Sequence, residues 1–127
     1  MAATMENAKA VITSHEQYVR AGDLDGVMTN MAPDIVLLAA GAPLIDGSKA
    51  FREFYTGFLG AGAWELVHDY HGGDVVGDTA FLHGVATATF KPHEGETQTI
   101  VNNFIHVLRL GADGQLRMWR AAFGPVE

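Results

Sequence analysis

The sequence contains no cysteine, only four prolines, and only eight lysines and arginines against fifteen aspartates and glutamates. Without cysteine the chain has neither disulfide bonds nor thiolate-bound metal, which is consistent with a reducing compartment. The formal net charge of −7 argues against nucleic acid and anionic membrane as partners. No apolar run approaches the roughly 18–20 residues of a membrane span, and the N-terminus MAATMENAK lacks a signal-peptide core. We therefore expect a cytoplasmic protein.

The composition that remains is that of an ordinary globular domain. At 127 residues and 48% hydrophobic content, the chain is long enough to bury a core, and we expect one domain over residues 1–127. No internal repeat, low-complexity tract or linker divides it. Fifteen glycines against four prolines favour a sheet-rich fold with many turns.

Two helices are predicted at the start of the chain. Over residues 5–21, apolar residues recur at helical spacing on a stripe that also contains His15, and Gly22 provides a natural end. Asp23 can cap a second, shorter helix that runs to Met31.

A buried strand and a third helix follow. Pro33 breaks the second helix, and the run IVLLAA over residues 35–40 predicts a buried strand. The turn-rich GAPLIDG segment leads to a third helix over residues 48–59, with Ser48 as its expected cap. The stripe of this helix is mainly aromatic and consists of Phe51, Phe54, Tyr55, Phe58 and Leu59.

In the second half of the chain, the hydrophobic residues recur with a period of two. Four strands are predicted over residues 64–76, 79–91, 97–110 and 115–124, joined by short turns. The longest strand candidate is IVNNFIHVLRL, at Ile100–Leu110. One of its faces carries Ile100, Asn102, Phe104, His106, Leu108 and Leu110. Both faces are mainly apolar, so we expect helices on one and a partner chain on the other.

Three helices followed by hairpin-connected strands indicate an α+β fold. We expect a cone-shaped, strongly curved mixed sheet wrapped on the helices, with a cavity inside. The outer face of the sheet, which includes Val101, Ile105 and Val107, is apolar enough to predict a homodimer through sheet packing.

Three segments, AGDLDGVMTNMAPDIVLL, DGSKAFREFY and LRLGADGQLRMWRAAFG, resemble the bacterial ketosteroid isomerases. That family belongs to the cone-shaped superfamily of nuclear transport factor 2, scytalone dehydratase and the SnoaL-type polyketide cyclases. The resemblance covers about residues 10–124. It implies the cone fold more strongly than any one activity, because one fold hosts many chemistries.

The catalytic residues of the isomerases do not carry over. The resemblance places the general-base aspartate at Ala39 and the oxyanion-hole tyrosine at His15, with Tyr18 one turn later. The second oxyanion residue, a neutral aspartate, falls on His106, and only the supporting tyrosine matches, at Tyr55. An isomerase without its carboxylate has lost its proton acceptor, so we do not expect a ketosteroid isomerase.

Four of the six histidines are candidates for one pocket. His15 lies on the inward helix stripe and His106 on the inward strand face; the isomerase pattern implies that His68 and His83 also face inward. His83 matches a strand histidine of scytalone dehydratase-like enzymes. Imidazole titrates near neutral pH, so two such groups can divide acid and base roles, although each could instead be a hydrogen-bonded core residue. No HxH or HxxxH spacing supports a metal site, and we expect no metal and no cofactor.

The candidate ligand contacts are mostly aromatic. Asn102 shares the inward face with His106, and the resemblance places Trp119 and Phe123 at pocket-lining positions. The predicted contact set is Tyr18, Phe54, Tyr55, Asn102, Phe104, Trp119 and Phe123. Its aromatic members are equally compatible with a simple core. As a cavity wall they would suit a flat, mostly apolar ligand with one or two oxygens.

These residues favour a cofactor-independent enzyme of the isomerase, dehydratase or cyclase kind. It would shift protons next to the carbonyl of a small cyclic, steroid-like or polyketide-like compound. His83 or His106 would be the base and the other the acid or oxyanion donor, with His15, Asn102 and Tyr55 orienting them. The alternative is a non-catalytic pocket or dimerisation module. A third class, an accessory domain for a partner enzyme, gains no support from any extra tail or basic patch.

Overall fold

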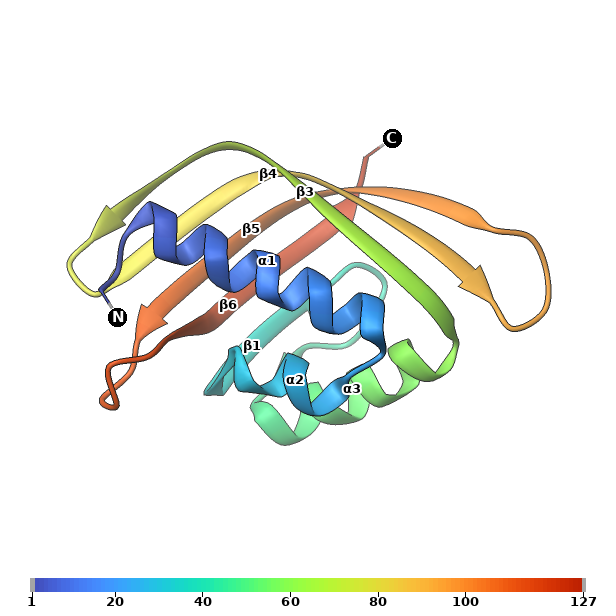
Figure 1. Ribbon diagram of the computed structural model, residues 1–127, viewed down its shortest axis with the longest axis horizontal. Helices are drawn as coiled ribbons and strands as arrows, with labels where there is room; N and C mark the ends of the chain where they lie inside the picture. The colour runs from blue at the N-terminus through green and yellow to red at the C-terminus, as the bar shows by residue number, and fades with distance from the viewer. Residues whose placement is uncertain (1, 127) are drawn as a thin grey trace.

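The computed structural model describes residues 2–126 and consists of three helices on the concave side of one curved, six-stranded sheet (Figure 1). Residues 1 and 127, which the predicted domain includes, lie outside this range. The helices are α1 (Met5–Ala21), α2 (Leu24–Thr29) and α3 (Ser48–Gly60). The strands are β1 (Met31–Ala39), β2 (Ile45–Asp46), β3 (Gly62–Val76), β4 (Thr79–Pro92), β5 (Gln98–Leu110) and β6 (Leu116–Pro125).

The sheet has the order β2-β1-β6-β5-β4-β3. Within the described residues, β1 and β6 are parallel and the other neighbouring strands are antiparallel. The long strands β3 to β6 bend around the helices, so one face of the sheet is concave and covered while the other is convex and open (Figure 1). The predicted α+β cone with a mixed sheet is confirmed.

The helix ends follow from local chemistry. Gly22 closes α1 in a left-handed conformation (φ 68°) and donates its backbone N–H to the carbonyls of the last turn. The Asp23 carboxylate caps α2 by accepting from the Gly26 N–H at 2.9 Å. At α3 the prediction was wrong: Gly47 is the cap residue and makes no side-chain cap bond, and Ser48 is the first helical residue.

The first strand begins earlier than predicted. β1 already starts at Met31, so α2 ends before that residue and Pro33 lies inside the strand. The proline is tolerated because the β1–β6 register is irregular between Met31 and Val36, where a missing N–H costs no regular ladder bond.

The core fills the closed end of the cone between α1, α2 and the sheet. Its largest fully buried side chains are Ile12, Val19, Val27, Ile35, Leu82 and Leu108. Each contributes roughly 1.5–3 kcal/mol by burial. No helix among residues 2–126 is long and apolar enough to cross a membrane.

Candidate functional site

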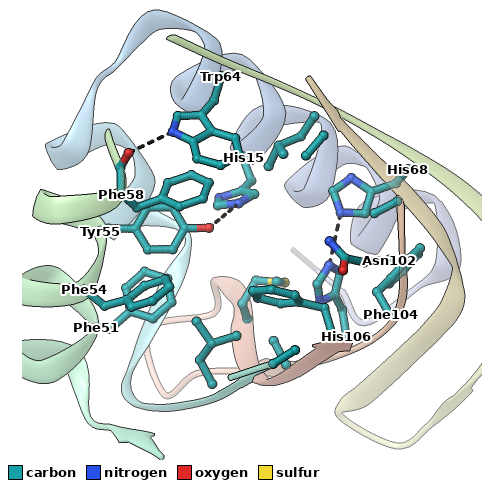
Figure 2. Close-up of a pocket in the computed structure, with 18 of the residues that line it drawn as sticks. His15, Phe51, Phe54, Tyr55, Phe58, Trp64, His68, Asn102, Phe104 and His106 are labelled. Atoms are coloured by element: carbon teal, nitrogen blue, oxygen red, sulfur yellow. Dashed lines mark hydrogen bonds between the residues drawn. The ribbon is translucent and has the colours of Figure 1, made fainter. Parts of the chain in front are cut away.

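A cavity of about 250 Å³ lies between the helices and the concave face of the sheet (Figure 2). It brings together eight of the predicted site residues: His15, Phe54, Tyr55, His68, Asn102, Phe104, His106 and Phe123. Among residues 2–126, no aspartate, glutamate, lysine or arginine lines it. Its interior is therefore mainly apolar, with a few polar side chains.

Aromatic rings from α3 and the adjoining strands form one wall of the cavity. Phe51 stacks on Tyr55 with ring centroids 4.6 Å apart, and Phe58 stacks on Trp64 at 4.0 Å. The indole N–H of Trp64 donates to the backbone carbonyl of Phe58 at 2.8 Å, which fixes this ring pair. These rings give the cavity a continuous aromatic wall.

On the same side of the cavity, a phenol contacts an imidazole. His15 of α1 and Tyr55 of α3 meet at 3.2 Å between Nε2 and the hydroxyl oxygen (Figure 2). Burial, with a smaller contribution from His68, lowers the pKa of His15 to about 3, and burial raises the pKa of Tyr55 above its usual value. Both groups are therefore neutral at physiological pH.

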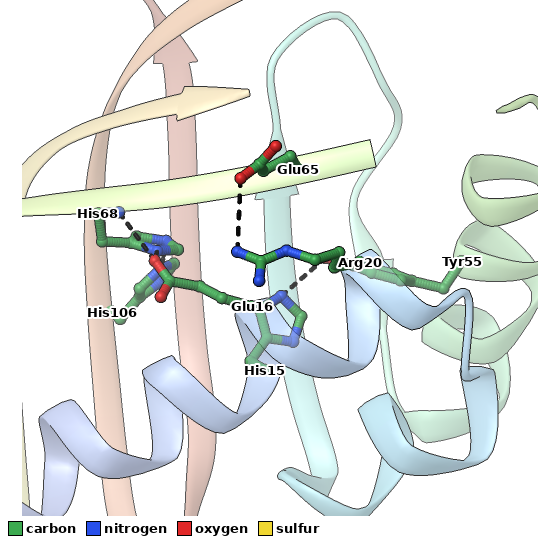
Figure 3. A network of polar contacts seen from close by, with 7 residues as sticks. All are labelled: His15, Glu16, Arg20, Tyr55, Glu65, His68 and His106. Atoms are coloured by element: carbon green, nitrogen blue, oxygen red, sulfur yellow. Dashed lines mark hydrogen bonds and ion pairs between the residues drawn. The ribbon is translucent and has the colours of Figure 1, made fainter. Parts of the chain in front are cut away.

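On the opposite side, a carboxylate and two imidazoles form a chain. Glu16 of α1 accepts from the backbone N–H of His68 at 2.9 Å and from its Nδ1 at 2.8 Å (Figure 3). The other ring nitrogen of His68 lies 3.2 Å from Nε2 of His106. Burial, and then the neighbouring His68 and His15, lower the pKa of His106 well below its ordinary value.

This chain fixes where the protons lie. Because the Glu16 carboxylate can only accept, His68 carries a proton on Nδ1 and, when neutral, accepts at Nε2. With His68 in this neutral form, His106 donates from Nε2 and its Nδ1 is an acceptor. That Nδ1 atom is buried and has no hydrogen-bond partner among residues 2–126, and the same holds for Nδ1 of His15. Within this range no group of three or more His, Asp or Glu side chains could hold a metal ion.

Comparison with known proteins identifies the family of this cavity-bearing fold. The sequence model of the SnoaL-like domain matches residues 12–119. The chain belongs to the SnoaL-like domain family. This agrees with the predicted place in the superfamily of nuclear transport factor 2 and the ketosteroid isomerases. No curated protein matches the sequence.

Solved structures share the fold of this SnoaL-like domain at low identity. A ketosteroid isomerase-like protein from Erwinia carotovora atroseptica is 19% identical with a TM-score of 0.81, and 98% of each chain is covered. A proposed dehydratase of the nuclear transport factor 2-like family from Streptomyces avermitilis is 18% identical (TM-score 0.83; 95% of each chain). A proposed scytalone dehydratase from Novosphingobium aromaticivorans is 13% identical (TM-score 0.87; 97% of this chain, 84% of that one). These similarities establish the fold alone.

The SnoaL-like domain places His83 outside the cavity, contrary to expectation. On β4 the inward residues include Ala80 and Leu82, both fully buried, and Ala86, which lines the cavity. His83 alternates with them and is exposed on the convex face, paired with Ile105. The prediction followed the isomerase pattern, whereas in the structure Ala86 and Ala88 face inward and leave space for the cavity.

Trp119 and Tyr18 also lie away from the cavity. The β5–β6 register shifts between Val107 and Leu108, so Trp119 is displaced to the convex surface, where its indole N–H donates to Asp34 at 3.1 Å. Tyr18 packs over Gly26, where the ring occupies the space of a missing side chain.

Glu16 is the residue that the sequence analysis missed. It sits one position beyond His15 and four beyond Ile12, at the edge of the inward stripe of α1. A carboxylate next to a buried helical stripe is a detectable signal, because a buried charge needs a partner. The prediction lists only the stripe itself and so omits it.

Proposed function

We propose that this SnoaL-like domain is a cofactor-independent proton-transfer enzyme, of the isomerase, dehydratase or cyclase type, for a small uncharged carbonyl compound. One observation carries the proposal: a histidine pair anchored by a carboxylate faces a phenol–imidazole pair across an apolar cavity (Figure 2). The names of two structural neighbours, a ketosteroid isomerase-like protein and a proposed scytalone dehydratase, support this reaction class by analogy.

His106 acts as the base in this proposal. Its Nδ1 takes a proton from the carbon next to the substrate carbonyl, and its Nε2 proton passes to Nε2 of His68. The positive charge then rests on the imidazole that already donates to Glu16. After these transfers, Nδ1 of His106 carries the proton taken from the substrate. The same atom then returns this proton to a second position of the substrate.

Tyr55 supplies the matching hydrogen bond to the carbonyl oxygen. Removal of a proton next to a carbonyl places negative charge on that oxygen, and a neutral phenol is a good donor to it. His15 can hold Tyr55 for this task by donating from Nε2 to the phenol oxygen, which leaves the phenol proton for the ligand.

The lining defines the class of substrate. A cavity of about 250 Å³ with no charged side chain favours a small neutral compound over a carboxylate or phosphate. Stacked aromatic rings on one wall suit a flat ring system. We propose a mono- or bicyclic ketone or enol with one or two oxygens.

Hydrogen–deuterium exchange next to the carbonyl of 2-tetralone, followed by NMR, tests the reaction. This bicyclic neutral ketone exchanges slowly on its own, and the protein should accelerate the exchange. His106→Asn should lower the acceleration by roughly 100-fold or more, the usual contribution of a general base. His83→Asn changes an exposed histidine on the other face and should leave the acceleration unchanged. Equal acceleration by both variants would contradict the mechanism.

A binding pocket without turnover is the alternative. Two observations favour it: no carboxylate among residues 2–126 lines the cavity, and Ala39 stands where the resemblance places the base of the isomerases. Saturable binding of 2-tetralone without any accelerated exchange would support this alternative and overturn the enzyme proposal.

A further inference from the structure

An apolar hollow of about 580 Å³ lies on the convex side of the sheet, beside the end of β1. Its walls include three large apolar side chains that are well exposed: Leu38 (52%), Leu44 (63%) and Ile105 (43%). Among residues 2–126, its lining contains one polar side chain, that of Asn103, and no charged one. Exposed apolar side chains gathered around one hollow indicate a binding surface for an apolar group.

The floor of the hollow is low because β6 carries small residues there. Ala122 and Gly124 pair with Ile105 and Asn103 of β5 and lie on the convex side, because Phe123 between them faces the cavity. The backbone of Gly124 does not have a positive φ, so the turn chemistry of glycine is not needed at this position. What its lack of a side chain provides here is space.

The hollow and the internal cavity meet at the rim of the sheet. Ala40 and Phe123 line both spaces, and the Ala40 N–H donates to the Phe123 carbonyl at 3.1 Å in the last bond between β1 and β6. A Cβ atom at Gly124 would meet only the methyl group of Ala40, at 4.0 Å. A chain that leaves the cavity here can therefore cross the rim over two of the smallest residues.

The cavity orients a ring ligand with its oxygen away from this rim. The groups proposed to act at the carbonyl belong to Tyr55 and His106, which are buried, whereas Ala40 at the rim is exposed. The end of the ring remote from the oxygen therefore points to the rim. A volume of about 250 Å³ lies below the roughly 300–1,000 Å³ of typical ligand pockets, so a larger ligand must extend beyond the cavity.

We propose that the ligand carries an aliphatic chain on the end of the ring remote from its oxygen, and that this chain crosses Ala40 and Gly124 into the outer hollow. The substrate class is then a ring ketone or enol with an alkyl substituent, not a bare ring. An uncharged chain suits a hollow whose lining is almost entirely apolar. This inference rests on the proposed function, because it requires a ring ligand in the cavity.

Isothermal titration calorimetry with 2-naphthol and 6-butyl-2-naphthol tests the proposal. The two compounds share the ring and the hydroxyl group and differ only in the butyl chain. Each methylene group removed from water increases affinity about fourfold, so the wild type should bind the butyl compound roughly tenfold more tightly or better.

Two variants alter the hollow without changing the cavity lining. Gly124→Leu fills the crossing point, and Leu44→Asp places a carboxylate in the wall of the hollow. In both, the dissociation constant of the butyl compound should rise to that of 2-naphthol, while the value for 2-naphthol stays unchanged. Gly57→Leu makes the same glycine-to-leucine change on exposed α3, where a Cβ atom meets nothing within 4 Å, and should retain the gain. Circular dichroism verifies that each variant is folded.

Three outcomes would overturn the proposal. Equal dissociation constants for the two compounds in the wild type would show that the hollow does not take the chain. A gain that survives both Gly124→Leu and Leu44→Asp would place the chain elsewhere. A wild type that binds neither compound would remove the ring ligand on which the inference rests. The exchange of 2-tetralone decides the proposed catalysis separately, so exchange without a gain for the butyl compound refutes this inference alone.

Discussion

The Glu16 carboxylate holds His68 by two hydrogen bonds, one from the backbone N–H at 2.9 Å and one from the ring at 2.8 Å. A helix residue thus fixes both the position of a strand and the tautomer of its imidazole. The contact is well shielded, since the side chain of His68 is 5% exposed and that of Glu16 is 19% exposed. The nearby Arg20–Glu65 pair, at 3.4 Å, is mostly exposed and contributes little by comparison (Figure 3).

Removing this carboxylate should destabilise the protein. Glu16→Ala leaves two donors of His68 without a partner, and we expect the free energy of unfolding to fall by about 1–3 kcal/mol in urea titrations. Gln17→Ala, at the next and exposed position of α1, should change it by less than about 0.5 kcal/mol. Similar values for both variants would show that the Glu16 contact is unimportant.

Stability should fall as the pH drops below about 6.5. Burial lowers the pKa of His15 to about 3, whereas the same histidine titrates near 6.5 in the unfolded chain. The unfolded state therefore binds more protons between these values, and the free energy of unfolding decreases by about 1.4 kcal/mol per pH unit for this group. The buried His106, whose pKa is also lowered, adds to the same trend.

His15→Phe isolates the contribution of one histidine. Urea titrations at pH 7 and pH 5 should show a loss of stability that is smaller in this variant than in the wild type by about 2 kcal/mol. An unchanged difference between the two pH values would mean that His15 is not the buried neutral group described above.

Filling the cavity should abolish ligand binding without unfolding the protein. Ala88 lines the cavity on β4, and Ala88→Leu places about three extra carbon atoms there. In a Trp119→Phe background, Trp64 is the only tryptophan and reports on the cavity directly. We expect 2-naphthol to quench its fluorescence in this background and not in the Ala88→Leu variant. Thr89→Leu, one residue along and outside the lining, should retain the quenching.

Two helical glycines should respond oppositely to alanine. A Cβ atom at Gly26 would lie 2.2 Å from the ring of Tyr18, so Gly26→Ala should destabilise the protein by about 1–3 kcal/mol. A Cβ atom at Gly57 meets nothing within 4 Å, and Gly57→Ala should stabilise α3 by about 0.5–1 kcal/mol. Thermal unfolding of both variants measures the two signs.

Secondary structure could be predicted from the sequence because hydrophobic period and turn chemistry are local. The predicted helix 5–21 and the strands 64–76 and 79–91 agree with the structure to within two residues. The face of β5 was also predictable, since Asn102 and His106 stand among large apolar neighbours on a regular strand. These two residues line the cavity as expected.

Which residues line the cavity could be predicted only in part, for physical reasons. Two of the errors concern strands in which alternation alone does not identify the inner face. On β4 the isomerase pattern pointed to the His83 face, whereas the inner face in the structure carries Leu82, Ala86 and Ala88. On β6 a register shift displaces Trp119, and a bulge has no signature in the period of the sequence. The role of Glu16 could not be predicted from local sequence, because it depends on a contact with His68, which lies 52 residues away in the chain.

The distribution of side-chain size along β4 has a consequence for how this family can vary. The strand contributes the fully buried Leu82 to the core in one half and the small Ala86 and Ala88 to the cavity in the other. The parts that hold the domain together are therefore separate from those that shape the space for a ligand. Substitutions at the alanines can change which molecule fits while the core remains intact, so one scaffold can accommodate new substrates through few mutations.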